Sequence, residues 1–433
     1  MKISIVTLGC KVNQSESASI EGSLREAGHE IVGTSDTPDV TIINTCTVTA
    51  KSDYQSRQMI RRAVKSGSRV IATGCYAQLR PDELSAIKGL DLVVGNAGKA
   101  KMLKYLKRLP ESAGETLENV ESPEYTLTSQ PYFSARTRAF LKIQDGCNLL
   151  CTYCAVPSAR GKSRSLDPDH IAKSIEDLAL NGYKEIVLTG VHIGAYGIEL
   201  EPKTSLFNLV DKIVSRYPQI RFRLTSIEPQ EFDERFLDLI NENLLCAHLH
   251  IPLQSGSDSV LQRMRRGYNT SIFRSLLEKI HSTCPDVSIG TDLIVGFPGE
   301  TDDDFNETIK FIEEIPLSYI HVFPYSKRPD TPAKSFSGHI NTEVKKERVK
   351  KAIEIANIKK TKYLSGQLNK KLDVIVEKNA VTSGYYRAIS GNYLRPLVEA
   401  KALQAGQRLE VRGVALRNQE LICKTIHDAS QVA

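Results

Sequence analysis

The feature that most constrains this 433-residue chain is a group of three cysteines, Cys147-x3-Cys151-x2-Cys154. They follow a strand-like run, A-F-L-K-I-Q-D-G, and fall within one short loop. Zinc sites usually pair one C-x2-C with a second, distant pair, and this chain has no second C-x2-C. Three thiolates in one loop after a strand instead suit a [4Fe–4S] cluster with one coordination position left for a non-protein ligand.

This cysteine spacing resembles the signature of radical S-adenosylmethionine (SAM) enzymes. Beyond the loop, strand-like and helix-like runs alternate, which is typical of βαβ units. The expected strands are 139–145, 185–190, 220–226, 246–251, 287–296 and 319–323. Six such strands resemble the partial (βα)6 barrel of that superfamily, whose site faces the carboxyl ends of the strands.

The resemblance makes the polar residues at these strand ends candidates for binding SAM. Glycine permits close backbone approach there, and polar side chains suit ribose and adenine. Tyr153, inside the cysteine loop, joins them because the superfamily often contacts adenine with backbone atoms there. The strand-end candidates are Thr189, Gly190, Ser226, Glu228, Gln254, Ser255 and Asp292.

Three further cysteines each follow a buried strand of a predicted N-terminal parallel α/β domain. Strands are expected at 2–8, 39–45, 69–73 and 91–95, with helix-like stretches between them. Cys10, Cys46 and Cys75 follow the first three. Carboxyl ends of parallel strands share one sheet edge, and neighbouring strands lie about 4.8 Å apart. The three thiols are therefore predicted to meet at a second cluster.

Positive charge is concentrated at the C-terminal end. The net charge is +6, but residues 341–433 alone hold 18 Lys/Arg and 9 Asp/Glu, which predicts a polyanion partner. A basic helix is expected at 341–365, followed by five short strands that fit a small barrel, at 371–377, 385–390, 392–399, 407–415 and 420–426. Aromatic and basic side chains that interleave there suit RNA, whose bases stack and whose phosphates pair. These are Tyr385, Arg387, Tyr393 and Arg395.

The whole chain resembles the methylthiotransferases of the radical SAM superfamily. The motifs that carry this resemblance are L-G-C-K-V-N-Q (8–14), N-T-C-T-V-T (44–49), G-C-Y-A-Q (74–78), C-N-L-L-C-T-Y-C (147–154), P-L-Q-S-G-S (252–257) and T-D-L-I-V-G-F-P-G-E-T (291–301). The implied organisation is an N-terminal cluster domain (1–109), a linker (110–135), a radical SAM core (136–340), a connecting helix (341–365) and a TRAM-like RNA-binding barrel (366–433).

The resemblance implies a branch as well as a family. L-G-C-K-V-N-Q, A-R-G-K-S-R-S (159–165) and G-V-H-I-G-A-Y-G (190–197) are similar to the branch that modifies N6-threonylcarbamoyladenosine at tRNA position 37. The alternatives are the branches that modify isopentenyladenosine in tRNA or an aspartate of a ribosomal protein. An alternative of another class is a non-catalytic iron–sulfur regulator that binds RNA.

The family's chemistry converts the C2–H of the adenosine into C2–S–CH3. The resemblance implies two [4Fe–4S] clusters and SAM: a radical cluster on Cys147, Cys151 and Cys154, and a second on Cys10, Cys46 and Cys75 that carries or supplies sulfur. It also implies an electron donor, a sulfur source and tRNA as partners, with the anticodon loop presenting adenosine 37. Arg160, Lys162 and Arg164, just after the cluster loop, are expected to contact this RNA.

Composition narrows the cellular setting. Nine cysteines in 433 residues are too sparse for a disulfide scaffold, and an odd number favours metal binding, catalysis or burial in a reducing compartment. No apolar run approaches the roughly 18–20 residues of a membrane span, and no secretory signal is visible at the N-terminus. We therefore expect a cytoplasmic protein without a membrane partner.

Overall fold

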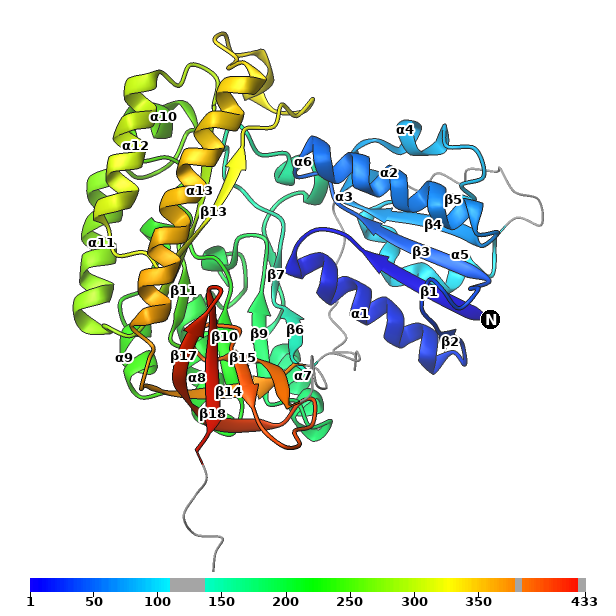
Figure 1. Cartoon of the computed structure of the whole chain (residues 1–433). Coiled ribbons are helices and arrows are strands. Elements are labelled where there is room, and N and C mark those ends of the chain that lie inside the picture. The colour runs from blue at the N-terminus through cyan, green and yellow to red at the C-terminus, as the bar shows by residue number, and fades with distance from the viewer. Residues whose placement is uncertain (110–136, 378–383, 427–433) are drawn as a thin grey trace, which may run out of the picture.

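The N-terminal unit is a parallel sheet whose strands lie in the order β2-β1-β3-β4-β5 (Figure 1). The structure is a computed structural model that describes residues 1–109, 137–377 and 384–426, so the linker expected at 110–135 lies outside the described residues. The strands are β1 (Lys2–Thr7), β2 (Glu30–Ile31), β3 (Val40–Thr45), β4 (Arg69–Gly74) and β5 (Leu92–Val94). The helices are α1 (Lys11–Glu26), α2 (Ala50–Lys65), α3 (Cys75–Leu79), α4 (Pro81–Ser85) and α5 (Met102–Leu106).

The central unit is an open barrel of six parallel strands. Two sheets, β10-β9-β6 and β11-β12-β13, are joined by a bridge between Phe222 and Leu245. The strands are β6 (Ala139–Lys142), β9 (Glu185–Thr189), β10 (Arg221–Leu224), β11 (His248–His250), β12 (Ser288–Val295) and β13 (Tyr319–Pro324). The helices are α6 (Val156–Arg160), α7 (Pro168–Leu180), α8 (Leu206–Arg216), α9 (Phe236–Asn241), α10 (Asp258–Arg263), α11 (Thr270–Thr283) and α12 (Asp302–Glu314).

Side-chain caps mark where several of these helices begin. Ser205 and Asn269 accept the backbone N–H three residues ahead at the starts of α8 and α11. Thr301 and Asp304 form a reciprocal capping box at the start of α12. Each cap satisfies a backbone donor that the first helical turn leaves free. The caps fix the point at which each strand-end loop gives way to a helix.

The C-terminal unit is a long helix followed by a closed five-stranded barrel. Helix α13 (Thr342–Ser365) runs along β13, and the barrel lies at the opposite end of the strands from the cysteine loop (Figure 1). The barrel strands are β14 (Lys371–Val376), β15 (Tyr385–Ser390), β16 (Leu397–Glu399), β17 (Arg408–Arg417) and β18 (Glu420–Thr425). The expected fold class, with an N-terminal parallel domain, a partial barrel and a small β-barrel, is confirmed.

One predicted strand is shorter than expected. The run 392–399 pairs only at β16, because the chain makes a tight turn before it. Tyr393 has φ 67°, and the Leu394 N–H donates to Ser390 Oγ at 2.9 Å. Within the described residues, no helix is both long and apolar enough to cross a membrane.

Two buried arginines of β10 join the central barrel to the C-terminal barrel. Arg221 donates to the carbonyls of Asp373 (2.8 Å) and Ile389 (3.1 Å). Arg223 donates to the carbonyls of Ser390 and Gly391, both at 2.9 Å. Both guanidinium groups also pair with Glu185, whose carboxylate is fully buried. The joint is therefore a charged layer that ends on main-chain oxygens.

Candidate active site

A glycine turn and a short strand pair shape the loop that carries the barrel cysteines. β7 (Gln144–Asp145) pairs antiparallel with β8 (Arg164–Ser165) across the base of the loop. Gly146 has φ +72°, and a Cβ there would lie 1.9 Å from the Lys162 carbonyl oxygen. The Cys147 N–H donates to the Gly161 carbonyl at 3.1 Å. Only glycine fits this turn, which starts the loop directly after β7.

The sulfur atoms in this loop are surrounded as cluster ligands would be. The Leu149 N–H donates to Cys147 Sγ at 3.4 Å, and Arg266 Nη1 lies 3.2 Å from Cys151 Sγ. Burial raises the pKa of Cys151 and raises that of Cys154 to about 12. Thiolates are therefore costly here unless a cation holds them, and iron is such a cation. The loop fits a [4Fe–4S] cluster with three protein ligands.

The N-terminal cysteines meet at the carboxyl ends of β1, β3 and β4. Cys10 caps α1, Cys46 follows β3, and Cys75 begins α3. A Cβ on Gly9, where φ is +96°, would lie 2.9 Å from Cys46 Sγ, so glycine lets the first loop approach the second. Burial and the neighbouring thiols of Cys75 and Cys10 raise the pKa of Cys46 to about 11. This second triad also fits three irons of a cluster.

Both triads border one cavity of about 240 Å³ between the N-terminal unit and the barrel. Cys75 lines it from one side and Cys154 from the other. Helices α3 and α6, which follow the two cysteines, pack against each other. The remaining lining residues are Thr47, Val48, Thr49, Tyr153, Ala155, Val156, Ala159, Gln254, Asp292, Ile294, Phe323, Pro324, Tyr325 and Ser326.

A buried ion network holds the two cysteine-bearing loops together. Arg160 of α6 donates to Glu16 of α1 at 2.8 Å and to Asp145 at 2.9 Å. Lys142 and Lys99 also bind Glu16. Burial alone would raise the pKa of Glu16, but these three cations outweigh it and hold that pKa well below its ordinary value. Arg160 is 2% exposed, so the RNA contact predicted for it is wrong.

Replacing Arg160 by methionine should strongly destabilise the protein. Removing one partner from a buried ion pair leaves uncompensated charge and typically costs about 3–5 kcal/mol. Glu16 and Asp145 would both lose their arginine here. The matched control is Arg235→Met, because Arg235 pairs with Asp233 at the surface. Denaturant unfolding should show a lower midpoint for Arg160→Met only, and equal midpoints would contradict the structural role.

A second bridge lies at the other rim of the cavity. Arg328, just after β13, donates to Asp53 of α2 at 2.5 Å and to Thr47 at 2.8 Å. Ser326 accepts the N–H of Ala50 at 3.0 Å. Thr47 follows Cys46 directly and itself lines the cavity. The N-terminal triad is thus held against the barrel from two sides.

The predicted SAM contacts do not all reach the cavity. Tyr153, Gln254 and Asp292 line it. Glu228 pairs with Arg266, which also contacts Cys151 and Tyr153. Ser255 is fully buried, its side chain lies near Thr308, and it does not line this cavity.

The other strand-end candidates for binding SAM do not line the cavity. Thr189 is buried, and its carbonyl accepts the Ile143 N–H. Gly190 lies against Gln144, whose side-chain oxygen would be 2.8 Å from a Cβ there. Ser226 Oγ forms a hydrogen bond with His250 Nδ1 at 2.8 Å.

The residues expected to contact RNA separate into exposed and engaged side chains. Lys162 and Arg395 are exposed, and Tyr385 is half-buried. Arg387 pairs with Glu420, and Arg164 donates to carbonyls of its own loop. Tyr393 stacks on His248, with ring centroids 4.3 Å apart, and lies beside Arg223 and Lys11. These neighbours from the central barrel and the N-terminal unit cover the Tyr393 ring, which contradicts the base stacking predicted for it.

Sequence reasoning missed several side chains around the cysteine loop. Arg266, 115 residues from Cys151, is its cationic neighbour. His192 contacts Glu231 at 2.8 Å. Burial disfavours its charged form, but hydrogen bonds with Cys147 and Glu231 outweigh burial and raise its pKa to about 10. Both residues come from loops far along the chain, so no local spacing points to them.

The fold and the barrel triad together define a radical SAM enzyme. Residues 141–312 match the family described as "Radical SAM superfamily", and residues 2–95 match "Uncharacterized protein family UPF0004". Among solved structures, the radical SAM methyltransferase TsrM from Kitasatospora setae superposes with a TM-score of 0.55 at 14% identity, over 77% of this chain and 75% of that one.

Full-length relatives narrow this class. The threonylcarbamoyladenosine tRNA methylthiotransferase MtaB of Bacillus subtilis is 39% identical over 94% of this chain and 92% of its own length. MtaB of Aquifex aeolicus is 39% identical over 89% and 95%. The tRNA-2-methylthio-N(6)-dimethylallyladenosine synthase of Clostridium tetani is 34% identical over 82% and 80%. The chain belongs to the methylthiotransferase family of radical SAM enzymes.

Proposed function

We propose that this enzyme adds a methylthio group to C2 of N6-threonylcarbamoyladenosine at position 37 of tRNA. The observation that carries the proposal is the single cavity bordered by both Cys75 and Cys154. A substrate in it would face the radical-generating loop and the N-terminal triad together. The names of relatives that align almost end to end support the threonylcarbamoyladenosine branch over the dimethylallyladenosine branch. They also disfavour the ribosomal-protein and non-catalytic alternatives.

We further assign a [4Fe–4S] cluster to each cysteine triad. When bound, the barrel cluster supplies the electron that cleaves SAM, and the N-terminal cluster supplies or carries the sulfur. The protein's own residues position these groups. The ion network around Arg160 and the Arg328 bridge fix the separation of the two triads. Apolar lining residues such as Ile294 and Phe323 exclude water from the reacting C2.

Nucleoside analysis of tRNA tests the proposal directly. Deleting the gene should remove 2-methylthio-N6-threonylcarbamoyladenosine from digested tRNA and leave its unthiolated precursor to accumulate. Restoring the intact gene should return the product. A strain that instead lost 2-methylthio-dimethylallyladenosine, or a modified ribosomal aspartate, would contradict the proposed substrate.

Exposed basic residues of the C-terminal barrel should anchor the tRNA. Truncation cannot test this, because it would strip Arg221 and Arg223 of their carbonyl partners. Replacing Arg395, Lys401 and Lys424 by glutamine removes three exposed charges, at the loss of the ion pairs of Arg395 with Glu377 and of Lys424 with Glu399. Each lost phosphate contact should make the negative slope of log affinity against log salt shallower by about 0.7–0.9. Lys162→Gln tests the competing idea that the loop at the barrel mouth binds most strongly, and an unchanged slope in the triple variant would favour it.

A further inference from the structure

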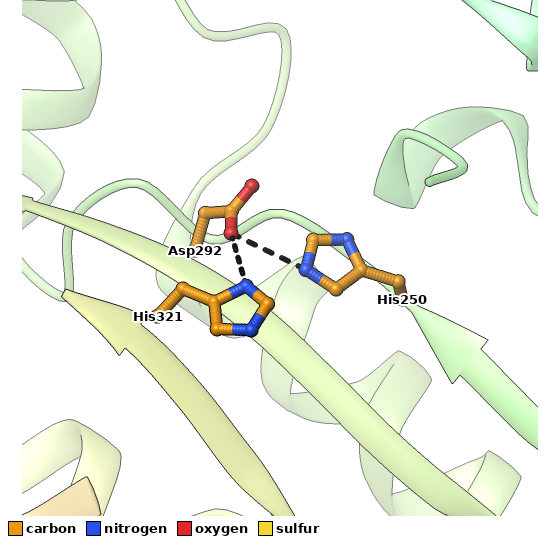
Figure 2. A group of neighbouring side chains, drawn as sticks. All are labelled: His250, Asp292 and His321. Atoms are coloured by element: carbon orange, nitrogen blue, oxygen red, sulfur yellow. Dashed lines mark hydrogen bonds and ion pairs between the residues drawn. The ribbon is translucent and has the colours of Figure 1, made fainter. Parts of the chain in front are cut away.

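The interior of the barrel holds a polar cluster in which two histidines surround Asp292, a residue predicted above as a SAM contact. Figure 2 shows His250, Asp292 and His321 converging from three neighbouring strands. Asp292 Oδ1 lies 3.3 Å from His250 Nε2 and 3.2 Å from His321 Nδ1. Ser226 Oγ holds the other nitrogen of His250 at 2.8 Å. Asp292 also lines the shared cavity, so the cluster opens onto the space where a substrate would lie.

Strand register accounts for this convergence. His321 of β13 is the direct neighbour of Asp292 in β12, and His250 of β11 pairs with Gly290. A Cβ on Gly290 would lie 2.0 Å from Tyr319 Cζ, so this glycine makes room for the tyrosine ring beneath the cluster. The His321 and Tyr319 ring centroids are 5.1 Å apart. The cluster is thus built on rigid, paired strands rather than on a loop.

Asp292 lines the cavity and offers an acceptor there, and His321 lies beside it with an exposed side chain. Burial would raise the pKa of Asp292, but its hydrogen bonds with His250 and His321 outweigh burial and hold that pKa far below its usual range. An ionised carboxylate only accepts, so the facing nitrogen of each imidazole donates to it. His321 Nε2 then has no hydrogen-bond partner among the described residues, and its side chain is 53% exposed. Asp292 Oδ2 likewise has no such partner.

The surrounding charge favours an anionic ligand over a cation. Below the cluster, burial together with the charges of Arg223 and Lys11 holds the pKa of His248 well below its ordinary value. Lys11 and Arg223 lie 5.3 and 5.1 Å from the centre of the Tyr393 ring. A divalent metal on the three side chains would add positive charge above these basic groups, which already disfavour the charged form of His248. Arg223 is itself paired with Glu185, so an anionic ligand would be held mainly by the histidines of the cluster.

We propose that His250, Asp292 and His321 form the subsite that recognises the polar N6 substituent of the adenosine. Resting on the proposed function, this inference deepens it. A threonylcarbamoyl group offers N–H and hydroxyl donors for Asp292 and for the lone pair of His321 Nε2 in the neutral ring, and its carboxylate suits the same nitrogen when the ring is protonated. A dimethylallyl group offers neither, and burying it here would leave the cluster without partners. Sites that hydrogen-bond their substrate strongly reject analogues lacking those groups.

Three stem–loop RNAs that differ only at adenosine 37 test this subsite. They carry threonylcarbamoyladenosine, dimethylallyladenosine or unmodified adenosine, and the reconstituted holoenzyme is assayed for binding and for single-turnover methylthio formation. The key variant is His321→Phe, which keeps a ring beside Tyr319 but loses both nitrogens. It should reduce the preference for the threonylcarbamoyl RNA by roughly 10- to 100-fold, the usual value of a charged hydrogen bond. His321→Gln, which retains a donor, should recover part of that preference.

Controls separate the possible outcomes. His170→Phe changes an exposed histidine of α7 and should keep the wild-type preference. An unchanged preference in His321→Phe would overturn the subsite. A preference that requires added Zn²⁺, with one bound zinc lost in the variant, would overturn direct recognition in favour of a metal. Wild-type enzyme that methylthiolates only the dimethylallyl RNA would instead overturn the proposed function, which is a distinct result.

Discussion

Alanine substitution of Cys147, Cys151 and Cys154 should abolish SAM cleavage and remove about half of the protein's iron. The three thiols share one loop between β7 and β8, and no other cysteine lines the cavity from the barrel side among the described residues. Without them nothing holds the group that delivers the electron. Cleavage is measured as 5′-deoxyadenosine formed after reduction, and iron is measured per chain after reconstitution.

A matched triple variant controls for the loss of thiols as such. Cys246, Cys284 and Cys423 are buried away from both triads, so changing them to alanine should preserve iron content and cleavage. Complete loss of iron from the barrel variant, or no loss, would contradict two clusters with independent ligands.

Alanine substitution of Cys10, Cys46 and Cys75 should preserve SAM cleavage but stop methylthio formation. SAM cleavage should continue, because these thiols lie across the cavity from the barrel loop and hold none of its hydrogen bonds. Methylthio product should disappear, because the cluster that we propose as the carrier of sulfur would lose its ligands. Mass spectrometry of digested tRNA together with the 5′-deoxyadenosine yield separates the two steps.

The N-terminal variant also shows whether lost activity comes from a lost sulfur role or from separation of the N-terminal unit from the barrel. The Arg160 network and the Arg328 bridge do not use the three thiols, so the two units should stay docked. Hydrogen–deuterium exchange at α3 and α6 reports this docking independently of activity. Product formed at the normal yield by a docked variant would refute a sulfur role for this triad.

Spacing and strand pattern predicted the fold because both act locally. Cys10, Cys46 and Cys75 lie far apart in sequence, yet each follows a buried strand, and parallel sheets bring strand ends to one edge. Cys147, Cys151 and Cys154 lie within eight residues of one another, so their grouping follows from the sequence without any tertiary information. The sequence alone therefore predicts that these six residues form two groups.

Burial and long-range pairing were beyond such reasoning. Arg160 stands in a basic run, A-R-G-K-S-R-S, that suggested phosphate contacts, but Glu16 of α1 draws its guanidinium inward. Tyr393 lies in an aromatic and basic stretch, but its turn points the ring at His248. His321 is an isolated histidine in a strand, and only its register with Asp292 gives it a chemical neighbour. In each case the decisive partner comes from another part of the chain.

The arginine joint beneath the barrel has an evolutionary consequence. Arg221 and Arg223 end on the carbonyl oxygens of residues 373, 389, 390 and 391. Every amino acid supplies the same carbonyl, so these four contacts do not depend on side chains of the small β-barrel, although Arg221 also pairs with the Asp373 carboxylate and Arg223 lies 5.1 Å from the centre of the Tyr393 ring. The exposed face of the small β-barrel can therefore change without removing these carbonyl contacts. Chimaeras that exchange this barrel between family members should assemble wherever the equivalent arginines are retained.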